Sequence, residues 1–296
     1  MLRRKVSKLC WKIYWHTHAL LHKPEPFLSD EQRAHWEKNG YLVLPGHFSK
    51  AQVDAVNSVV DDRWSRSRNH KSDTVADIFV DTPRYKRVKM HDAPADARSL
   101  PYKMNDLFLE SDAVRKLALE ERLSRALFEI LTGHPLLCNS LNLEFGSQQE
   151  FHTDSLYMTP PVGLNLAASW VALEDTHPDA GPLRYYPGSH LIAPYRFSTG
   201  RMTAVDAEMD AYRVYMRKQV AELGLKEETF CGKAGDVFIW HSQLFHGGSA
   251  IRNPKLTRKS IVFHYFRTAD LPARHRRHSE DAFFMKREPQ PVPASV

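Results

Sequence analysis

Residues 235–249 read GDVFIWHSQLFHGGS, and this stretch decides how the rest of the 296-residue chain is interpreted. Its apolar run, residues 237–240, is short and lies close after a glycine, which is typical of a buried β-strand. His246 comes shortly after this run and precedes Gly247 and Gly248, whose backbones can turn and leave room for a ligand. The stretch therefore predicts a β-rich domain that presents a histidine beyond a buried strand.

Residues 151–154, FHTD, carry a second set of chemically active side chains. Side chains two residues apart on an extended chain point to the same face, so His152 and Asp154 can bind one metal ion in adjacent positions. Adding His246 gives two histidines and one carboxylate, which leave coordination positions open, as in non-haem Fe(II) oxygenases. Zinc usually takes a closed tetrahedral set, often with thiolates, and no cysteine lies near these motifs.

His241 is the alternative to His246 as the third ligand. We prefer His246 because Gly-Gly-Ser follows it directly and a basic pair, Arg258 and Lys259, comes soon after. His241 would then be a buried histidine that makes one hydrogen bond. We expect His190 and His264 to have structural or supporting roles.

The rest of the chain changes from helical to strand-like patterns. Ser29, with Gln32 three residues on, predicts a helix that runs to Gly40. Further helices are expected at 49–64 and 111–131, and 67–100 reads as a long loop or lid. Strands are expected at 41–44, 137–145, 149–153, 164–173, 183–186, 236–240 and 259–267, with a helical insert at 204–223.

This order predicts a mainly β fold with flanking helices (α+β), namely a double-stranded β-helix (jelly roll, cupin-like) core buttressed by N-terminal helices. The length and the 42% of hydrophobic residues suit one domain, placed at 27–270. A basic amphipathic extension, 1–26, precedes it. A polar tail, 271–296, follows it and is expected to be loosely ordered.

The net charge of +6 comes from the extension. Residues 1–24 contain six basic and no acidic residues, and the remaining 35 basic residues balance the 35 acidic ones. The body is therefore neutral, which does not favour nucleic-acid binding. The extension could pack on the domain or lie on an anionic membrane surface. The scattered cysteines and the lack of a spanning apolar run favour a cytoplasmic protein, membrane-associated only through this extension.

Several motifs, in this order, resemble the phytanoyl-CoA dioxygenase family of Fe(II)/2-oxoglutarate-dependent oxygenases. The matching segments are 39–46 (NGYLVLPG), 152–154 (HTD), 170–175 (WVALED), 181–190 (GPLRYYPGSH), 246–249 (HGGS) and Arg258. The resemblance covers roughly residues 28–267. It implies Fe(II), O2 and 2-oxoglutarate as cosubstrate.

The cosubstrate's far carboxylate needs a cation, and a guanidinium suits it because its fork binds a carboxylate bidentately. Arg258 is the candidate, with Lys259 as the alternative, because the spacing from His246 is one residue longer than the family pattern. Ser249 could add a hydroxyl donor. The resemblance further implies that Lys103, Asn142 and Trp170 line the cosubstrate site. Lys103 could instead be a surface lysine and Trp170 plain core, while an inward Asn142 needs a partner such as a cosubstrate oxygen.

The implied reaction is hydroxylation of an unactivated C–H bond, with succinate and CO2 as coproducts. Asp154 favours this over halogenation, because related halogenases have a small residue there. The substrate would be a small or lipid-like molecule, and segments 67–100 and 195–230 are expected to cover the site. Two alternatives stay open. One is a peripheral membrane or interaction protein with a vestigial iron site, and the other is a zinc-dependent cupin-like hydrolase.

Overall fold

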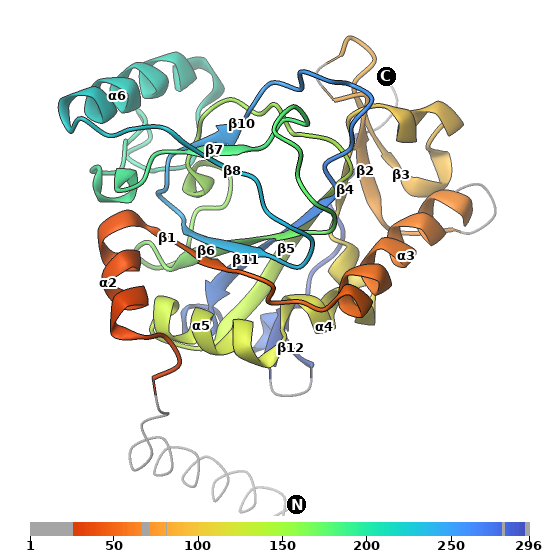
Figure 1. Cartoon of the computed structure of the whole chain (residues 1–296), viewed down its shortest axis with the longest axis horizontal. Coiled ribbons are helices and arrows are strands. Elements are labelled where there is room, and N and C mark those ends of the chain that lie inside the picture. Colours follow the sequence, from red (N-terminus) through yellow and green to blue (C-terminus); the bar gives the residue numbers. More distant parts are fainter. Residues whose placement is uncertain (1–25, 67–70, 81, 280–281, 294–296) are drawn as a thin grey trace, which may run out of the picture.

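The computed structural model describes residues 26–66, 71–80, 82–279 and 282–293, which form two β-sheets with helices around them (Figure 1). Among these residues the larger sheet has ten strands and the smaller one three. The main path of the larger sheet is β1 (Tyr41–Leu44), β9 (Val237–His241), β6 (Leu166–Ala172), β11 (Ser260–Arg267), β5 (Pro135–Leu143), β4 (Lys103–Asn105), β2 (Val75–Ile78) and β3 (Lys86–Lys89). The smaller sheet is β10 (His246–Gly248), β7 (Leu183–Tyr185) and β8 (Glu228–Phe230).

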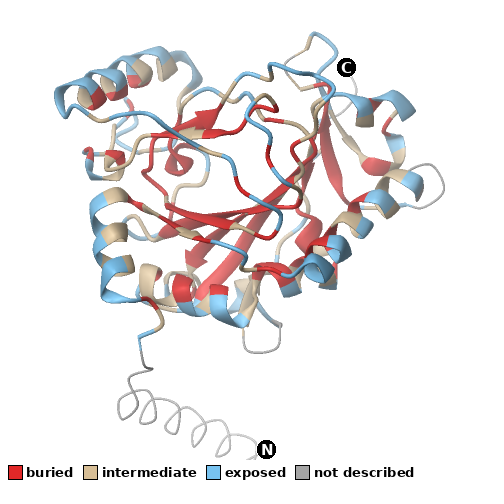
Figure 2. Ribbon diagram, in the orientation of Figure 1, coloured by how far each residue is buried: buried red, intermediate tan, exposed pale blue. Residues whose placement is uncertain are grey.

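The larger sheet has side chains in two separate hydrophobic clusters, and most of its central strands are coloured as buried in Figure 2. On one face, Phe263 and Tyr265 of β11 join the main hydrophobic core. The helices that contribute to this core are α3 (Lys50–Arg66), α4 (Asp112–Ala118) and α5 (Glu121–Leu131), with α2 (Asp30–Asn39) packed at its edge. On the other face, Trp170 and Val262 pack against Tyr185 of the smaller sheet. The chain is therefore a helix-buttressed sandwich, which confirms the predicted fold class.

Local sequence explains the first helix and the strand after it. Ser29 and Gln32 form a reciprocal capping box at the start of α2. Gly40 ends the helix with a φ of 75°, a conformation that glycine adopts at little cost. Strand β1 follows at once and pairs with β9, so both predicted elements are confirmed. The predicted strands around 137, 164, 183, 236 and 259, and the helical insert as α6 (Met209–Glu222), are confirmed as well.

Four regions differ from the sequence-based expectations. Residues 149–153 form no strand, only a single antiparallel bridge between His152 and His246. The expected loop at 67–100 contains β2 and β3, which extend the larger sheet. The expected helix at 111–131 is two helices, because Glu120 caps α5 by accepting a hydrogen bond from the Leu123 amide. The fourth region is the tail.

The tail is not loosely ordered throughout. Strand β12 (Arg276–Ser279) pairs with β13 (Ala282–Met285), and β13 lies parallel to β5. Phe284 packs against the main core, which supplies the driving force for this hairpin. The domain boundaries at residues 26 and 270 stay predictions.

The amphipathic segment 1–24 lies outside the described residues. Within the described part of the chain, no helix is both long and apolar enough to cross a bilayer.

Candidate metal centre

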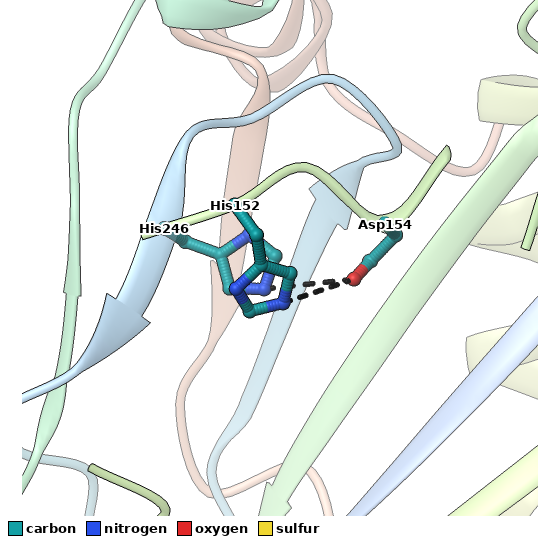
Figure 3. Close-up of side chains that lie close together, drawn as sticks. All are labelled: His152, Asp154 and His246. Carbon is teal, nitrogen blue, oxygen red and sulfur yellow. Dashed lines mark ion pairs between the residues drawn. The ribbon is translucent and has the colours of Figure 1, made fainter. Parts of the chain in front are cut away.

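A short backbone pairing brings the two predicted histidine ligands together. The His152 amide donates to the His246 carbonyl at 2.8 Å, and the His246 amide returns a hydrogen bond at 3.0 Å. Residues paired in this way project their side chains to the same side, so the two imidazole centroids lie 4.4 Å apart. His246 reaches this position from β10 of the smaller sheet, and His152 from the segment beside it (Figure 3).

Both imidazoles are oriented by a carbonyl two residues upstream. His152 Nδ1 lies 2.8 Å from the Glu150 carbonyl, and His246 Nδ1 lies 2.9 Å from the Leu244 carbonyl. Because a carbonyl only accepts, each Nδ1 carries the proton and each Nε2 of a neutral ring keeps its lone pair. Both Nε2 atoms face Asp154 (Figure 3). This arrangement is the one that metal-binding histidines use.

The two oxygens of Asp154 have different partners. Oδ1 lies 3.8 Å from His152 Nε2 and 3.6 Å from His246 Nε2. Oδ2 accepts a hydrogen bond of 2.7 Å from the Trp240 indole and lies 3.5 Å from His264 Nε2. Trp240 and His264 come from β9 and β11 of the larger sheet. The larger sheet therefore holds one carboxylate oxygen, while the other is left for a ligand shared with the histidines.

Burial and mutual charge set the protonation of this group. Burial, with His246 next in importance, lowers the pKa of His152 to about 3, so its ring is neutral near pH 7. Burial by itself raises the pKa of Asp154, but His246 and His264 together hold it below its ordinary value. The three side chains offer two imidazole nitrogens and one carboxylate, all buried, with their ligand atoms within 4.8 Å of one another. This donor set fits a divalent metal ion with open positions.

Gly247 and Gly248 are needed for close packing. A Cβ on Gly247 would lie 2.8 Å from the Gln149 carbonyl, and one on Gly248 would lie 2.6 Å from the Gln148 amide. The sequence suggested that these glycines leave room for a ligand. The structure shows that they make room for the segment that carries His152.

Arg258 is buried on the side of the larger sheet that faces the smaller sheet. Its guanidinium is 5.6 Å from the centre of the Trp170 ring and donates to the Gly181 carbonyl at 3.1 Å. Burial lowers its pKa to about 10, with no carboxylate acting against this effect. Its Nε has no hydrogen-bond partner among the described residues. A buried guanidinium in this state is suited to bind an incoming carboxylate.

Two neighbours of Arg258 also carry unpaired donors. Within the described residues, Trp170 Nε1 and Ser260 Oγ are buried and have no hydrogen-bond partner. Ser260 was not predicted, although its position two residues after Arg258 could have indicated it. Ser249 is close by, since its carbonyl lies against Gly181. We call Arg258, Trp170 and Ser260 the anchor end of the site.

Lys103 and Asn142 occupy opposite faces of the larger sheet. Lys103 precedes Met104 on β4, and Met104 belongs to the main core, so the alternation of side chains along the strand puts Lys103 on the face toward the smaller sheet. Asn142 is paired with Met104 and Ile261, both members of the main core on the helix side. Cross-strand neighbours share a face, so this register does not support Asn142 as a cosubstrate contact. Its amide nitrogen instead donates to the Ser260 carbonyl.

Lys259 and His241, the alternatives to Arg258 and His246, both have other neighbours in the structure. Lys259 Nζ lies 3.8 Å from Glu144, so its charge is already paired, and this favours Arg258 as the anchor. The ring of His241 lies 5.5 Å from that of His190, and burial lowers the pKa of His241 to about 4. It is not part of the metal-binding group.

The overall fold is similar to that of solved oxygenase structures. EctD from S. alaskensis, crystallised with 2-oxoglutarate and 5-hydroxyectoine, shares 17% identity over 90% of this chain and 87% of that chain, with a TM-score of 0.60. SnoK, a non-haem α-ketoglutarate-dependent carbocyclase from nogalamycin biosynthesis, shares 18% identity over 81% of this chain and 84% of that chain, with a TM-score of 0.59. At these identities the likeness concerns the fold. No curated protein sequence matches the chain significantly.

The sequence profile of phytanoyl-CoA dioxygenase (PhyH) matches residues 36–260, which is most of the chain. This range contains every motif named above, from the helix–strand junction at Gly40 to Ser260. The chain belongs to the phytanoyl-CoA dioxygenase family of Fe(II)/2-oxoglutarate-dependent oxygenases.

Proposed function

We propose that this protein is an Fe(II)- and 2-oxoglutarate-dependent dioxygenase that hydroxylates an unactivated C–H bond of a small-molecule or lipid-like substrate. The observation that carries the proposal is the meeting of His152, Asp154 and His246, with both Nε2 lone pairs and one carboxylate oxygen directed at one point. The anchor end supports it, because Arg258 is buried and its Nε has no hydrogen-bond partner among the described residues.

Each end of the site has a distinct task. His152, Asp154 and His246 would hold the iron, while Arg258 would bind the far carboxylate of 2-oxoglutarate, with Trp170 and Ser260 as further donors. Lys103, on the face of the larger sheet toward the smaller sheet, would add positive charge that favours an anionic cosubstrate. Together the bound groups would supply an O2-dependent oxidation, with succinate and CO2 as coproducts.

The substrate would approach between α6 and the segment that carries the metal ligands. Tyr157 is 58% exposed, and its ring lies 5.6 Å from that of His152. A hollow of about 450 Å³ lies between α6 and Glu150, lined by Glu150, Asp210, Arg213, Val214 and Arg217. Tyr212 of α6 donates to the hydroxyl of Thr153, which ties the helix to this segment. Variation in α6 would therefore change which substrates reach the metal.

The proposal is tested by uncoupled succinate formation from 2-oxoglutarate with Fe(II) and O2. We expect succinate from the wild type and a loss of about 10³-fold or more, roughly 4 kcal/mol, in His152→Ala. His241→Gln is the matched control, since His241 lies outside the metal group, and it should keep its rate. Unchanged turnover in His152→Ala would contradict the ligand assignment.

The two alternatives give different results in the same experiment. A zinc-dependent hydrolase would contain stoichiometric zinc after anaerobic purification and would be active without iron. A vestigial site would bind metal and form no succinate. Peripheral membrane contact through residues 1–24 is a separate proposal. It predicts that the full chain sediments with anionic liposomes and that a chain lacking these residues does not.

A further inference from the structure

The tail hairpin, β12 and β13, positions the side chain of Arg287 beside strand β5 of the larger sheet. Strand β13 pairs in parallel with β5 through Phe283 and Phe284. This pairing brings Arg287 beside β5, where its Nε donates to the Cys138 carbonyl at 3.1 Å. Its terminal nitrogen forms an ion pair of 2.6 Å with Asp106. Arg287 lies outside the family match, which ends at residue 260.

Asp106 links this cation to β5. Its side chain is 2% exposed, and burial raises its pKa while Arg287 opposes that effect. The same oxygen that binds Arg287 accepts a hydrogen bond of 3.0 Å from the amide nitrogen of Asn139. A carboxylate only accepts, so Asp106 fixes which end of the Asn139 amide faces it.

Asn139 in turn orients His264. With its nitrogen on Asp106, the amide presents its oxygen to His264 Nδ1 at 3.0 Å. The two residues are directly paired between β5 and β11, and the register shifts at the next position of β11. Such a bulge re-aims the side chains around it. The other ring nitrogen of His264 then faces Asp154 Oδ2, 3.5 Å away.

We propose that Arg287, Asp106 and Asn139 are positioning residues of the metal centre, which act through His264 on the carboxylate of Asp154. This inference rests on the proposed function, because Asp154 must be a metal ligand for it to hold. All three residues are buried or half-buried and none contacts the other two ligands in the described structure. The tail would thus set the affinity for iron through β5 and β11 of the larger sheet.

The test compares Arg287→Gln with Lys286→Ala, which removes a neighbouring exposed cation. Anaerobic titration with Co(II) or Fe(II), followed by tryptophan fluorescence, measures the dissociation constant directly. Direct supporting partners of metal ligands are worth about 10–100-fold in affinity, and we expect about fivefold for this more remote residue. Lys286→Ala should bind like the wild type. Arg287→Lys, which keeps the charge, should recover most of the loss.

A second variant separates positioning from a merely structural role. Asn139→Leu cuts the connection, so adding Arg287→Gln to it should change the metal affinity no further. Additive losses, or wild-type affinity in Arg287→Gln, would overturn the inference and leave the proposed function intact. A wild-type protein that binds no metal would overturn both.

Discussion

The metal end and the anchor end of the site differ in how completely the protein satisfies its own polar atoms. At the metal end, each histidine Nδ1 has a carbonyl partner and Asp154 Oδ2 has the Trp240 indole. At the anchor end, donors of Arg258, Trp170 and Ser260 are buried without partners among the described residues.

This difference indicates which end of the site is preorganised by the protein and which end needs a ligand to satisfy its polar groups. A buried donor without a partner costs about 1–3 kcal/mol, and the cost is recovered when a ligand supplies the acceptor. The metal end is therefore shaped by the protein before anything binds, whereas the anchor end is complete only with a bound carboxylate. The two ends should respond in opposite ways to substitution.

Among tests of this difference between the two ends, the largest effect is expected at Arg258. Arg258→Met removes a bidentate, charge-assisted contact, so the KM for 2-oxoglutarate should rise about 100-fold, equivalent to about 2.7 kcal/mol. The Tm of the protein without cosubstrate should stay the same or rise, because an unpaired buried charge is lost. Lys259→Met is the control, with little expected change in KM because Lys259 pairs with Glu144. A KM that rises in the Lys259 variant instead would reassign the anchor.

A smaller effect is expected at Trp240. Trp240→Phe keeps an aromatic side chain but removes the indole N–H that donates to Asp154, and the dissociation constant for Fe(II) should rise about tenfold. Trp170→Phe makes the same change at the anchor end and should leave metal affinity unaltered while raising the KM for 2-oxoglutarate. Anaerobic metal titration of both variants checks this. Equal metal affinities in the two variants would erase the distinction between the ends.

The sequence predicted the metal end because its ligands lie in short local patterns. His152 and Asp154 are two residues apart, and His246 is followed by glycines that the close segment requires. Their supporting partners could not be predicted in this way. The contacts from Trp240 and His264 to Asp154 depend on which strands are neighbours in the larger sheet.

Segment 67–100 and the tail were predicted wrongly for another reason. Their charged residues suggested exposed loops, but several of these charges are buried or form ion pairs. Segment 67–100 is rich in Asp and Arg, yet Asp77 of β2 is buried and paired with Arg87 of β3 at 2.7 Å. The tail is basic, yet Arg287 is bound to Asp106. The composition of a segment does not predict which charged residues pair with one another.

The smallest effect is expected when one buried hydroxyl group is removed from either face of the larger sheet. Ser260→Ala removes a hydroxyl that has no partner until cosubstrate binds, so KM should rise about fivefold, roughly 1 kcal/mol, with no loss of stability. Ser169→Ala is the matched control, since its hydroxyl contacts the Tyr265 hydroxyl at 3.3 Å on the helix side. That variant should lose about 1 kcal/mol in the free energy of unfolding and keep its KM. Steady-state kinetics and urea unfolding of both variants check the pair, and a stability loss in Ser260→Ala would mean that the anchor end is already satisfied by the protein.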